Sequence, residues 1–179
     1  MSIDLILMFS ITIKISLDSL LILAMIIRGY KPGDLEACAN LILDTSKKYN
    51  KDDIIPWKED EFFWFFDYEN DREKVEKFFS ESNVIIAEND MWEIVWILRY
   101  EHNRIKSFFV SEKCMHQWIW KTLFEKYKKD LIDDWFKFVT LFSSTYWIRF
   151  YESLWFEITW DRVLRWDAIY SYPMRLLLE

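Results

Sequence analysis

Glycine, histidine and cysteine each occur only twice in this chain of 179 residues. A chain of this length usually contains about a dozen glycines. Phosphate-wrapping loops such as G-x-G-x-x-G or the Walker loop cannot be written with glycines only at Gly29 and Gly33. The scarcity of glycine therefore argues against nucleotide-handling enzymes, and we expect both glycines in turns beside helix junctions.

The few cysteines and histidines leave little material for catalysis. Cys38 and Cys114 are too few for a disulfide scaffold, which predicts a reduced pair in a cytoplasmic protein. Cys114 and His116 stand on an expected helix at a spacing that points their side chains to different faces. A nucleophile built from His102 and Cys114 requires the fold to bring them together. A zinc site needs three or four ligands, and the sequence offers no second cluster of ligands near Cys114 and His116. From the scarcity of these residues and of glycine, we predict no catalytic residue, no metal ligand and no cofactor.

The distribution of charge indicates what kind of partner the chain could bind. The net charge is −7, which argues against nucleic acid and anionic membranes because Lys and Arg drive phosphate binding. Residues 34–101 contain 18 acidic and eight basic side chains, a net of −10, and the remainder is at +3. Such an acidic region would attract a basic protein, although a solvated surface explains it as well.

The N-terminal apolar stretch, residues 3–27, is not expected to span a membrane. Asp4, Lys14 and Asp18 interrupt it, and charges near the centre of a span cost about 2.5–3.5 kcal/mol each. Apolar and polar residues alternate along 3–17, which predicts a long half-buried strand.

Periodicity along the rest of the chain predicts an α+β fold. A period of two recurs at 146–160, so long strands are expected near both ends. We expect one domain over residues 1–179, with a mainly antiparallel sheet covered by helices. Residues 1–56 would form an aliphatic layer and residues 57–179 an aromatic-rich remainder. Further strands are expected at 61–67, 84–88, 92–100 and 105–110, and helices at 20–27, 35–48, 71–79, 111–127, 131–142 and 161–170.

Aromatic residues are abundant, with 11 Trp, 15 Phe and 9 Tyr, and nearly all of them follow residue 56. Segment 57–71 combines aromatic and acidic side chains, and aromatic residues are enriched at binding hot spots. Its phenylalanines could equally be core. The candidate partner interface consists of Trp57, Asp60, Glu61, Trp64, Asp67, Tyr68, Glu69 and Asp71.

Other charged motifs fit specific chemistry poorly. The acidic run 67–78 resembles a calcium loop but has Arg72 where such a loop needs glycine and Phe78 where it needs glutamate. The acidic pair Asp133–Asp134 could serve magnesium only if it converges with other carboxylates. Lysines at 121–129 could bind single-stranded nucleic acid, but they also suit a helix C-terminus.

These observations favour a protein that acts by binding. We predict a small acidic intracellular protein, not an enzyme, of the inhibitor or immunity type, directed against a basic protein. Viruses and mobile elements encode accessory proteins with this profile. One alternative is a metal-dependent hydrolase or nuclease that uses clustered carboxylates. Another is a self-assembling, virion-type structural subunit, and exposed strand edges offer a route to a homodimer.

Overall fold

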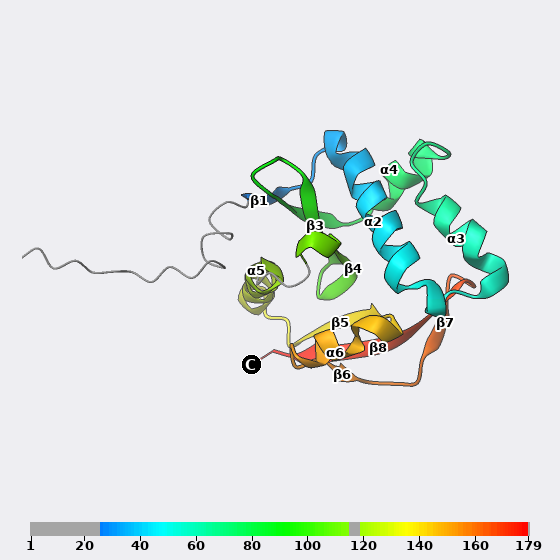
Figure 1. The fold of residues 1–179 in the computed structure, drawn as a ribbon. Helices are drawn as coiled ribbons and strands as arrows, with labels where there is room; N and C mark the ends of the chain where they lie inside the picture. Colours follow the sequence, from blue (N-terminus) through cyan, green and yellow to red (C-terminus); the bar gives the residue numbers. More distant parts are fainter. Residues whose placement is uncertain (1–25, 115–118, 179) are drawn as a thin grey trace, which may run out of the picture.

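The computed structural model describes residues 26–114 and 119–178. Its eight strands form one sheet of order β1-β2-β3-β4-β5-β8-β6, with β7 paired to β8 (Figure 1). Every pair is antiparallel except β4–β5, which is parallel. The strands are β1 (Ile26–Gly29), β2 (Asn83–Glu88), β3 (Ile94–Glu101), β4 (Arg104–Val110), β5 (Phe138–Ser143), β6 (Glu157–Ile158), β7 (Val163–Arg165) and β8 (Ile169–Leu177).

The helices lie in two groups. Three of them, α2, α3 and α4, lie together at one end of the molecule, and α5 lies at the other end (Figure 1). A parallel strand pair needs a crossover, and α5 provides it between β4 and β5. The helices are α2 (Leu35–Tyr49), α3 (Glu59–Phe65), α4 (Arg72–Ser80), α5 (Ile119–Asp133) and α6 (Ile148–Glu152). Shorter 3₁₀ turns are η1 (Pro32–Asp34), η2 (Lys51–Asp53), η3 (Pro56–Lys58), η4 (Glu112–Cys114) and η5 (Thr145–Trp147).

The predicted fold class is confirmed: the molecule is a single α+β domain with a mixed, mostly antiparallel sheet and helices. The helices expected at 35–48 and 71–79 are α2 and α4, and the three expected strands between 84 and 110 are β2, β3 and β4. At the start of α4 the Asp71 carboxylate accepts a hydrogen bond from the Lys74 amide at 3.1 Å, which is the cap that the sequence suggested. The extent of the domain over residues 1–179 and its division at residue 56 stay predictions.

The prediction of a strand at 61–67 is wrong, because most of this segment belongs to the helix α3. Phe62 and Phe66 are four residues apart and both are buried, whereas Trp64 between them is exposed. This is the burial pattern of a helix. A continuous aromatic run cannot distinguish the two structures by its periodicity.

The C-terminal third also differs from expectation. Segment 146–160 contains η5, α6 and the short β6, not one long strand, and 161–170 leads into β7 and β8 instead of a helix. The helix expected at 131–142 is divided between the end of α5 and β5. In β8 the buried residues alternate on both sides of Pro173, so a proline that suggested a helix end lies within a strand.

Residues 26–29 form the strand β1. The prediction of a helix at 20–27 is therefore wrong for residues 26 and 27, and the rest of that segment lies outside the described residues. The strand expected at 3–17 lies outside the described residues. Within the part of the chain that is described, no helix is long and apolar enough to cross a membrane.

Gly33 lies in η1, a turn directly before α2, as expected, whereas Gly29 ends the strand β1. Neither glycine adopts a left-handed conformation, but within the described residues six others do: Trp92, His102, Trp135, Trp155, Trp166 and Asp167. Such values of φ are disfavoured for bulky side chains. The chain therefore uses tryptophan at turns where glycine would be less strained.

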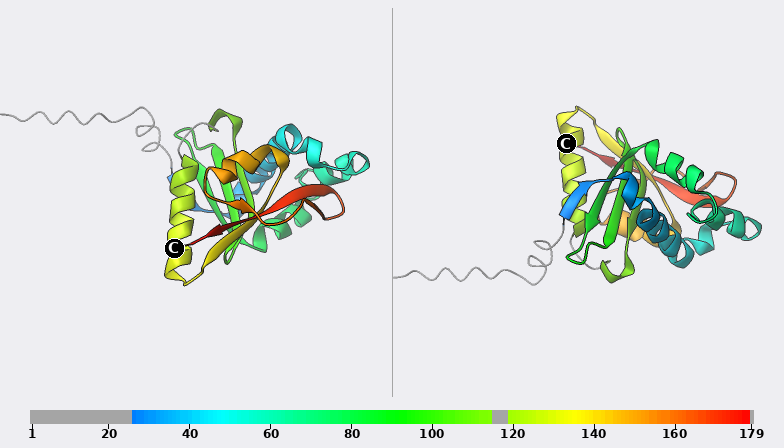
Figure 2. Two further views of the ribbon diagram at one scale, coloured as in Figure 1. Left: turned by 90° about the horizontal axis from the view of Figure 1, so that it is seen from below. Right: turned by 90° about the horizontal axis from the view of Figure 1, so that it is seen from above.

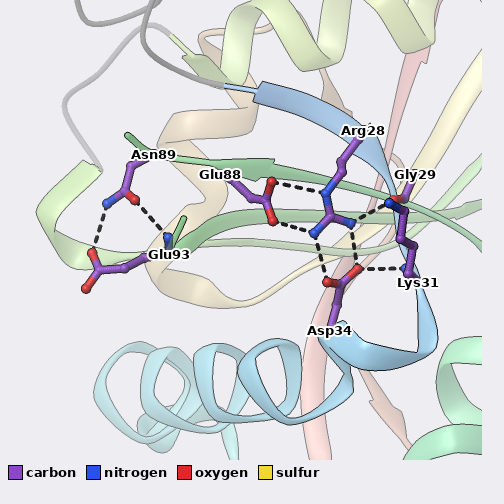
Figure 3. A network of polar contacts seen from close by, with 7 residues as sticks. All are labelled: Arg28, Gly29, Lys31, Asp34, Glu88, Asn89 and Glu93. Atoms are coloured by element: carbon purple, nitrogen blue, oxygen red, sulfur yellow. Dashed lines mark hydrogen bonds and ion pairs between the residues drawn. The ribbon is translucent and has the colours of Figure 1, made fainter. Parts of the chain in front are cut away.

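A paired charge network joins the outer strands β1 and β2 to the start of α2 (Figure 3). The Arg28 guanidinium donates to both carboxylate oxygens of Asp34, at 2.7 and 2.8 Å, and also to Glu88. The Lys31 amide donates to Asp34 at 2.7 Å. The hydrogen bonds from Arg28 hold the pKa of Asp34 below its usual value.

Candidate active site

The sheet is split between β4 and β5. Only Arg104 and Thr140 pair across this junction, and the Thr140 amide donates to the Asn103 carbonyl at 2.9 Å. Beyond that point β4 continues to Val110 and β5 to Ser143 without pairing to each other. The strands of the two halves run in clearly different directions (Figure 2). The two strand edges therefore diverge and leave space between them.

The unpaired edge of β4 offers main-chain hydrogen-bonding groups. The Ser111 amide donates to the Val95 carbonyl of β3 at 2.8 Å. Because such bonds alternate along an antiparallel ladder, the main-chain groups of Phe108 and Val110 point away from β3. The Thr45 hydroxyl of α2 donates a hydrogen bond to the Val110 carbonyl at 3.4 Å, so this carbonyl already has a partner.

A cavity of about 90 Å³ lies at the split. Its walls come from α2, α3 and α4, from β4, from the end of β5 with α6, and from the β7–β8 hairpin. The lining residues are Ser46, Asn50, Phe62, Phe66, Phe78, Lys106, Ser107, Phe108, Phe109, Phe142, Ser143, Ser144, Trp147, Tyr151, Arg165, Trp166, Ile169 and Ser171. A smaller, aromatic-lined pocket between β4 and α6 shares Phe108, Trp147 and Tyr151 with it.

Three buried polar atoms on the cavity wall have no hydrogen-bond partner: Ser46 Oγ, Asn50 Oδ1 and Ser144 Oγ. They are half of the six such atoms within the described residues. Leaving a buried polar atom unpaired costs about 1–3 kcal/mol, so their gathering in one cavity is unfavourable for the empty protein. A polar ligand, or the water it displaces, would satisfy them.

Tyr151 lies on the same wall and holds its proton firmly. It is in α6, only 7% exposed, and burial raises the pKa of its phenol. The turn that leads into α6 is fixed by Asp53, a buried carboxylate that accepts a hydrogen bond from the Thr145 amide at 2.7 Å. Tyr151 therefore stays protonated and lines the cavity as a hydrogen-bond donor.

The cavity contains cations but no carboxylate. Its lining has no Asp, Glu or His among the described residues. The Lys106 side chain is paired with Glu101 at 2.7 Å, whereas the side chain of Arg165 forms no hydrogen bond or ion pair with a described residue. The Arg165 guanidinium lies 4.2 Å from the ring centres of both Phe142 and Trp166. Burial and the neighbouring charge of Arg104 lower the pKa of Arg165 to about 10.

A second guanidinium lies behind this wall. Arg99 of β3 is only 5% exposed and donates to the Ser107 hydroxyl at 3.2 Å and to the Phe78 carbonyl. Burial lowers the pKa of Arg99 to about 10. Its Nε is buried without a partner, so positive charge near the cavity is not neutralised by hydrogen-bonded acids.

The residues predicted as a partner interface do not line this cavity. Trp57 and Trp64 are exposed, as are Asp60, Glu61 and Glu69, and Tyr68 is half-buried. Asp67 and Asp71 accept hydrogen bonds from the Glu69 and Lys74 amides. The phenylalanines between them, Phe62 and Phe66, face the cavity instead. Whether the exposed face binds a partner stays a prediction, as does dimerisation through strand edges.

The described residues do not bring together the other candidate motifs for metal binding or cysteine chemistry. No group of three or more potential metal ligands occurs in residues 26–114 and 119–178. Cys38 and Cys114 are both buried and free, and burial raises the pKa of each thiol. His102 occupies the β3–β4 turn, and His116 lies outside the described residues.

The fold is that of the GCN5-related N-acetyltransferases. A GCN5-related N-acetyltransferase from Rhodopseudomonas palustris has a TM-score of 0.72 at 15% identity, covering 86% of this chain and 95% of that one. The PaiA N-acetyltransferase from Thermoplasma acidophilum, in complex with coenzyme A, has a TM-score of 0.63 at 15% identity over 86% and 98% of the two chains. Spermidine N-acetyltransferase from Vibrio cholerae, with CoA and spermine, has a TM-score of 0.59 at 12% identity over 87% and 96%. No protein-family model and no curated protein sequence matches this chain.

These likenesses overturn the prediction of a non-enzymatic binding protein. An inhibitor or immunity factor, a carboxylate metallohydrolase and a virion-type subunit are all contradicted, because the similar structures are acetyltransferases. Two of the similar structures contain coenzyme A, so this fold binds a nucleotide-containing ligand in other proteins. Sequence reasoning also missed Tyr151, because the apparent alternation of 146–160 concealed α6. The run Ser143-Ser144-Thr145 before it is a helix-start signal that could have revealed it.

Proposed function

We propose that this protein is an acyl-CoA-dependent N-acetyltransferase. The observation that carries the proposal is the split sheet of an acetyltransferase fold, with a cavity at the split that contains three unpartnered buried polar atoms. The likeness extends over most of the chain and nearly all of each similar protein. Two of these proteins hold coenzyme A.

The residues at the split fit an acyl carrier of this kind. Coenzyme A has an extended arm with amide groups, and an extended ligand can add to an open strand edge through main-chain hydrogen bonds. The main-chain groups of Phe108 and the amide of Val110 would hold that arm, because the Val110 carbonyl already accepts a hydrogen bond from the Thr45 hydroxyl. When bound, the carrier supplies an acetyl group activated as a thioester.

The phosphate end would be held in an unusual way. No glycine occurs between Ser111 and Trp118, so a glycine-rich phosphate loop cannot be written there. Lys113 lies in η4, which precedes α5 in the chain, and the N-terminal end of a helix favours a negative charge. Contacts to phosphate would therefore depend on a lysine and the helix.

The side chains of the cavity have clear roles in acetyl transfer. Tyr151 can donate the proton of its hydroxyl to the sulfur that leaves when the new C–N bond forms. The aromatic walls limit the access of bulk water to a thioester. Because no carboxylate or histidine is among the described residues that line the cavity, the amine would lose its proton to a water molecule, which Asn50 and Ser144 could hold by hydrogen bonds.

The proposal is tested by the release of free thiol from acetyl-CoA in the presence of a panel of amines. In Tyr151→Phe we expect kcat to fall by roughly a hundredfold or more, with little change in the KM for acetyl-CoA. Tyr146→Phe is the matched control, because Tyr146 is exposed in η5 and lines no cavity. Failure of the purified protein to bind coenzyme A in calorimetry would refute the proposal.

A further inference from the structure

The Arg165 guanidinium, which has no charged partner in the cavity, indicates which kind of amine could accept the acetyl group. Arg165 projects from the end of β7 and is held between two aromatic rings, those of Phe142 and Trp166. Aromatic contacts of this kind fix the plane of a guanidinium and leave its edge donors available. None of those donors is used by a described residue, so the group is oriented and its donors are available to a ligand.

Positive charge is concentrated at this place instead of being neutralised. The Arg104 guanidinium lies 4.9 Å from the centre of the Phe142 ring that Arg165 also contacts. The Arg104 side chain likewise forms no ion pair or hydrogen bond with a described residue, although its charge helps to lower the pKa of Glu101. Two like charges at one ring repel each other, and each unpaired one would be stabilised by an anion.

The arrangement is unfavourable for a polycationic acceptor. The spermidine acetyltransferase from Vibrio cholerae is in complex with spermine. In the present cavity a polyamine would meet Arg165 and Lys106, and no carboxylate among the described lining residues. An acceptor with an anionic group would instead form charge-assisted hydrogen bonds with the planar edge of Arg165.

We infer that the acceptor is a small amine that also bears a carboxylate, as an amino acid does, and that Arg165 binds this carboxylate. The inference rests on the proposed acetyltransferase function. A single free guanidinium matches the single charge and the two oxygens of a carboxylate. The unpartnered oxygens of Asn50 and Ser144 in the same cavity can accept hydrogen bonds from the amino group. A cavity of about 90 Å³ suits a small molecule.

The first experiment compares amino acids with their decarboxylated counterparts. Phenylalanine and phenethylamine form one pair, and ornithine and putrescine form another. Binding to the wild-type protein is followed by tryptophan fluorescence, which Trp166 and Trp147 in the cavity wall should report. We expect the carboxylate member of a pair to bind roughly ten- to hundredfold more tightly, as the loss of a hydrogen bond to a charged group implies. Tighter binding of the decarboxylated amines, or of phosphoethanolamine, would overturn the inference.

The second experiment changes the arginine. Arg165→Gln should abolish the preference for the carboxylate member, and Arg165→Lys should keep part of it because the charge remains without the planar fork. Arg162→Gln is the matched control, because Arg162 lies three residues earlier in the chain, is exposed, and contacts the Tyr170 ring outside the cavity. Circular dichroism verifies that each variant is folded. An unchanged preference in Arg165→Gln would contradict the assigned role.

Coenzyme A binding separates this inference from the function on which it rests. If Arg165→Gln binds coenzyme A like the wild type and loses the carboxylate preference, both stand. If coenzyme A binds but the carboxylate preference is absent, only the acceptor assignment fails. If coenzyme A does not bind, the acetyltransferase proposal and the assignment of an acceptor fail together.

Discussion

The outer edge of the sheet and the split at its centre use arginine in opposite ways. At the outer edge, Arg28 is surrounded by Asp34 and Glu88 and its pKa is raised by their hydrogen bonds. At the split, Arg165 lies against aromatic rings with no acid beside it, and its pKa is lowered to about 10. Both guanidiniums are partly buried, so the difference is one of partners.

This difference indicates that the charge of Arg28 stabilises the fold, whereas the charge of Arg165 is available to bind a ligand. A partly buried charge without a partner lowers stability. The chain keeps such a charge at the cavity while it pairs the arginine at its edge. Unsatisfied hydroxyl and amide oxygens gather at the same cavity. A functional site is expected where several polar or charged side chains lack a hydrogen-bond or ion-pair partner within the protein.

The largest effect is expected when the paired arginine is removed. Arg28→Met should lower the free energy of unfolding by about 2 kcal/mol, between the values typical of surface and buried pairs, because Asp34 and Glu88 lose their partner. Arg165→Met, the matched variant, should leave stability unchanged or slightly raised, because no acid is left unpaired. Urea unfolding followed by tryptophan fluorescence measures both. An equal loss in the two variants would remove the distinction drawn above.

The stabilising contribution of Arg28 should also depend on pH. The folded-state pKa of Asp34 lies below its unfolded value, so its contribution is fully present above the unfolded pKa of about 3.9 and is lost as pH falls through the folded pKa. The difference in stability between wild type and Arg28→Met should therefore be constant near neutrality and shrink below about pH 4. Urea unfolding over an acidic pH series tests this. Arg72→Met, which removes an exposed pair with Glu76, should show little such change.

The smallest effect is expected at Trp135, whose backbone is strained although the residue lies outside the cavity that contains Arg165. Trp135 follows α5 with φ of 64° and is 83% exposed. Trp135→Gly should raise the free energy of unfolding by about 1 kcal/mol without changing activity, because glycine adopts this conformation freely. Trp57→Gly is the control, since Trp57 is 82% exposed but has no positive φ. Thermal unfolding should show stabilisation only in the first variant.

Local signals in the sequence were sufficient for part of the fold. Asp71 before a charged stretch with Val75 and Phe79 defines α4, because capping and an i, i+4 apolar pair act within a few residues. The strands on either side of the turn at His102 follow from short apolar runs bounded by polar turn residues. Where a run was uniformly aromatic, as at 61–67, burial by tertiary contacts decided the outcome and local pattern could not.

The site could not be found in the same way. Asn50, Ser144 and Arg165 come from separate parts of the chain and meet only because β5, α2 and the β7–β8 hairpin converge at the split. Ser144 and Asn50 look like ordinary turn residues in sequence, and Arg165 like a solvated charge. Their significance lies in a lack of partners, which is a property of the folded structure.

The single ladder pair between Arg104 and Thr140 leaves the edge of β4 without a strand partner beyond that point. An extended molecule bonded along this edge would take the place of the missing strand. The amides of Phe108 and Val110 would then exchange more slowly with deuterated water when the molecule is bound, so hydrogen exchange at this edge would report whether the cleft is occupied.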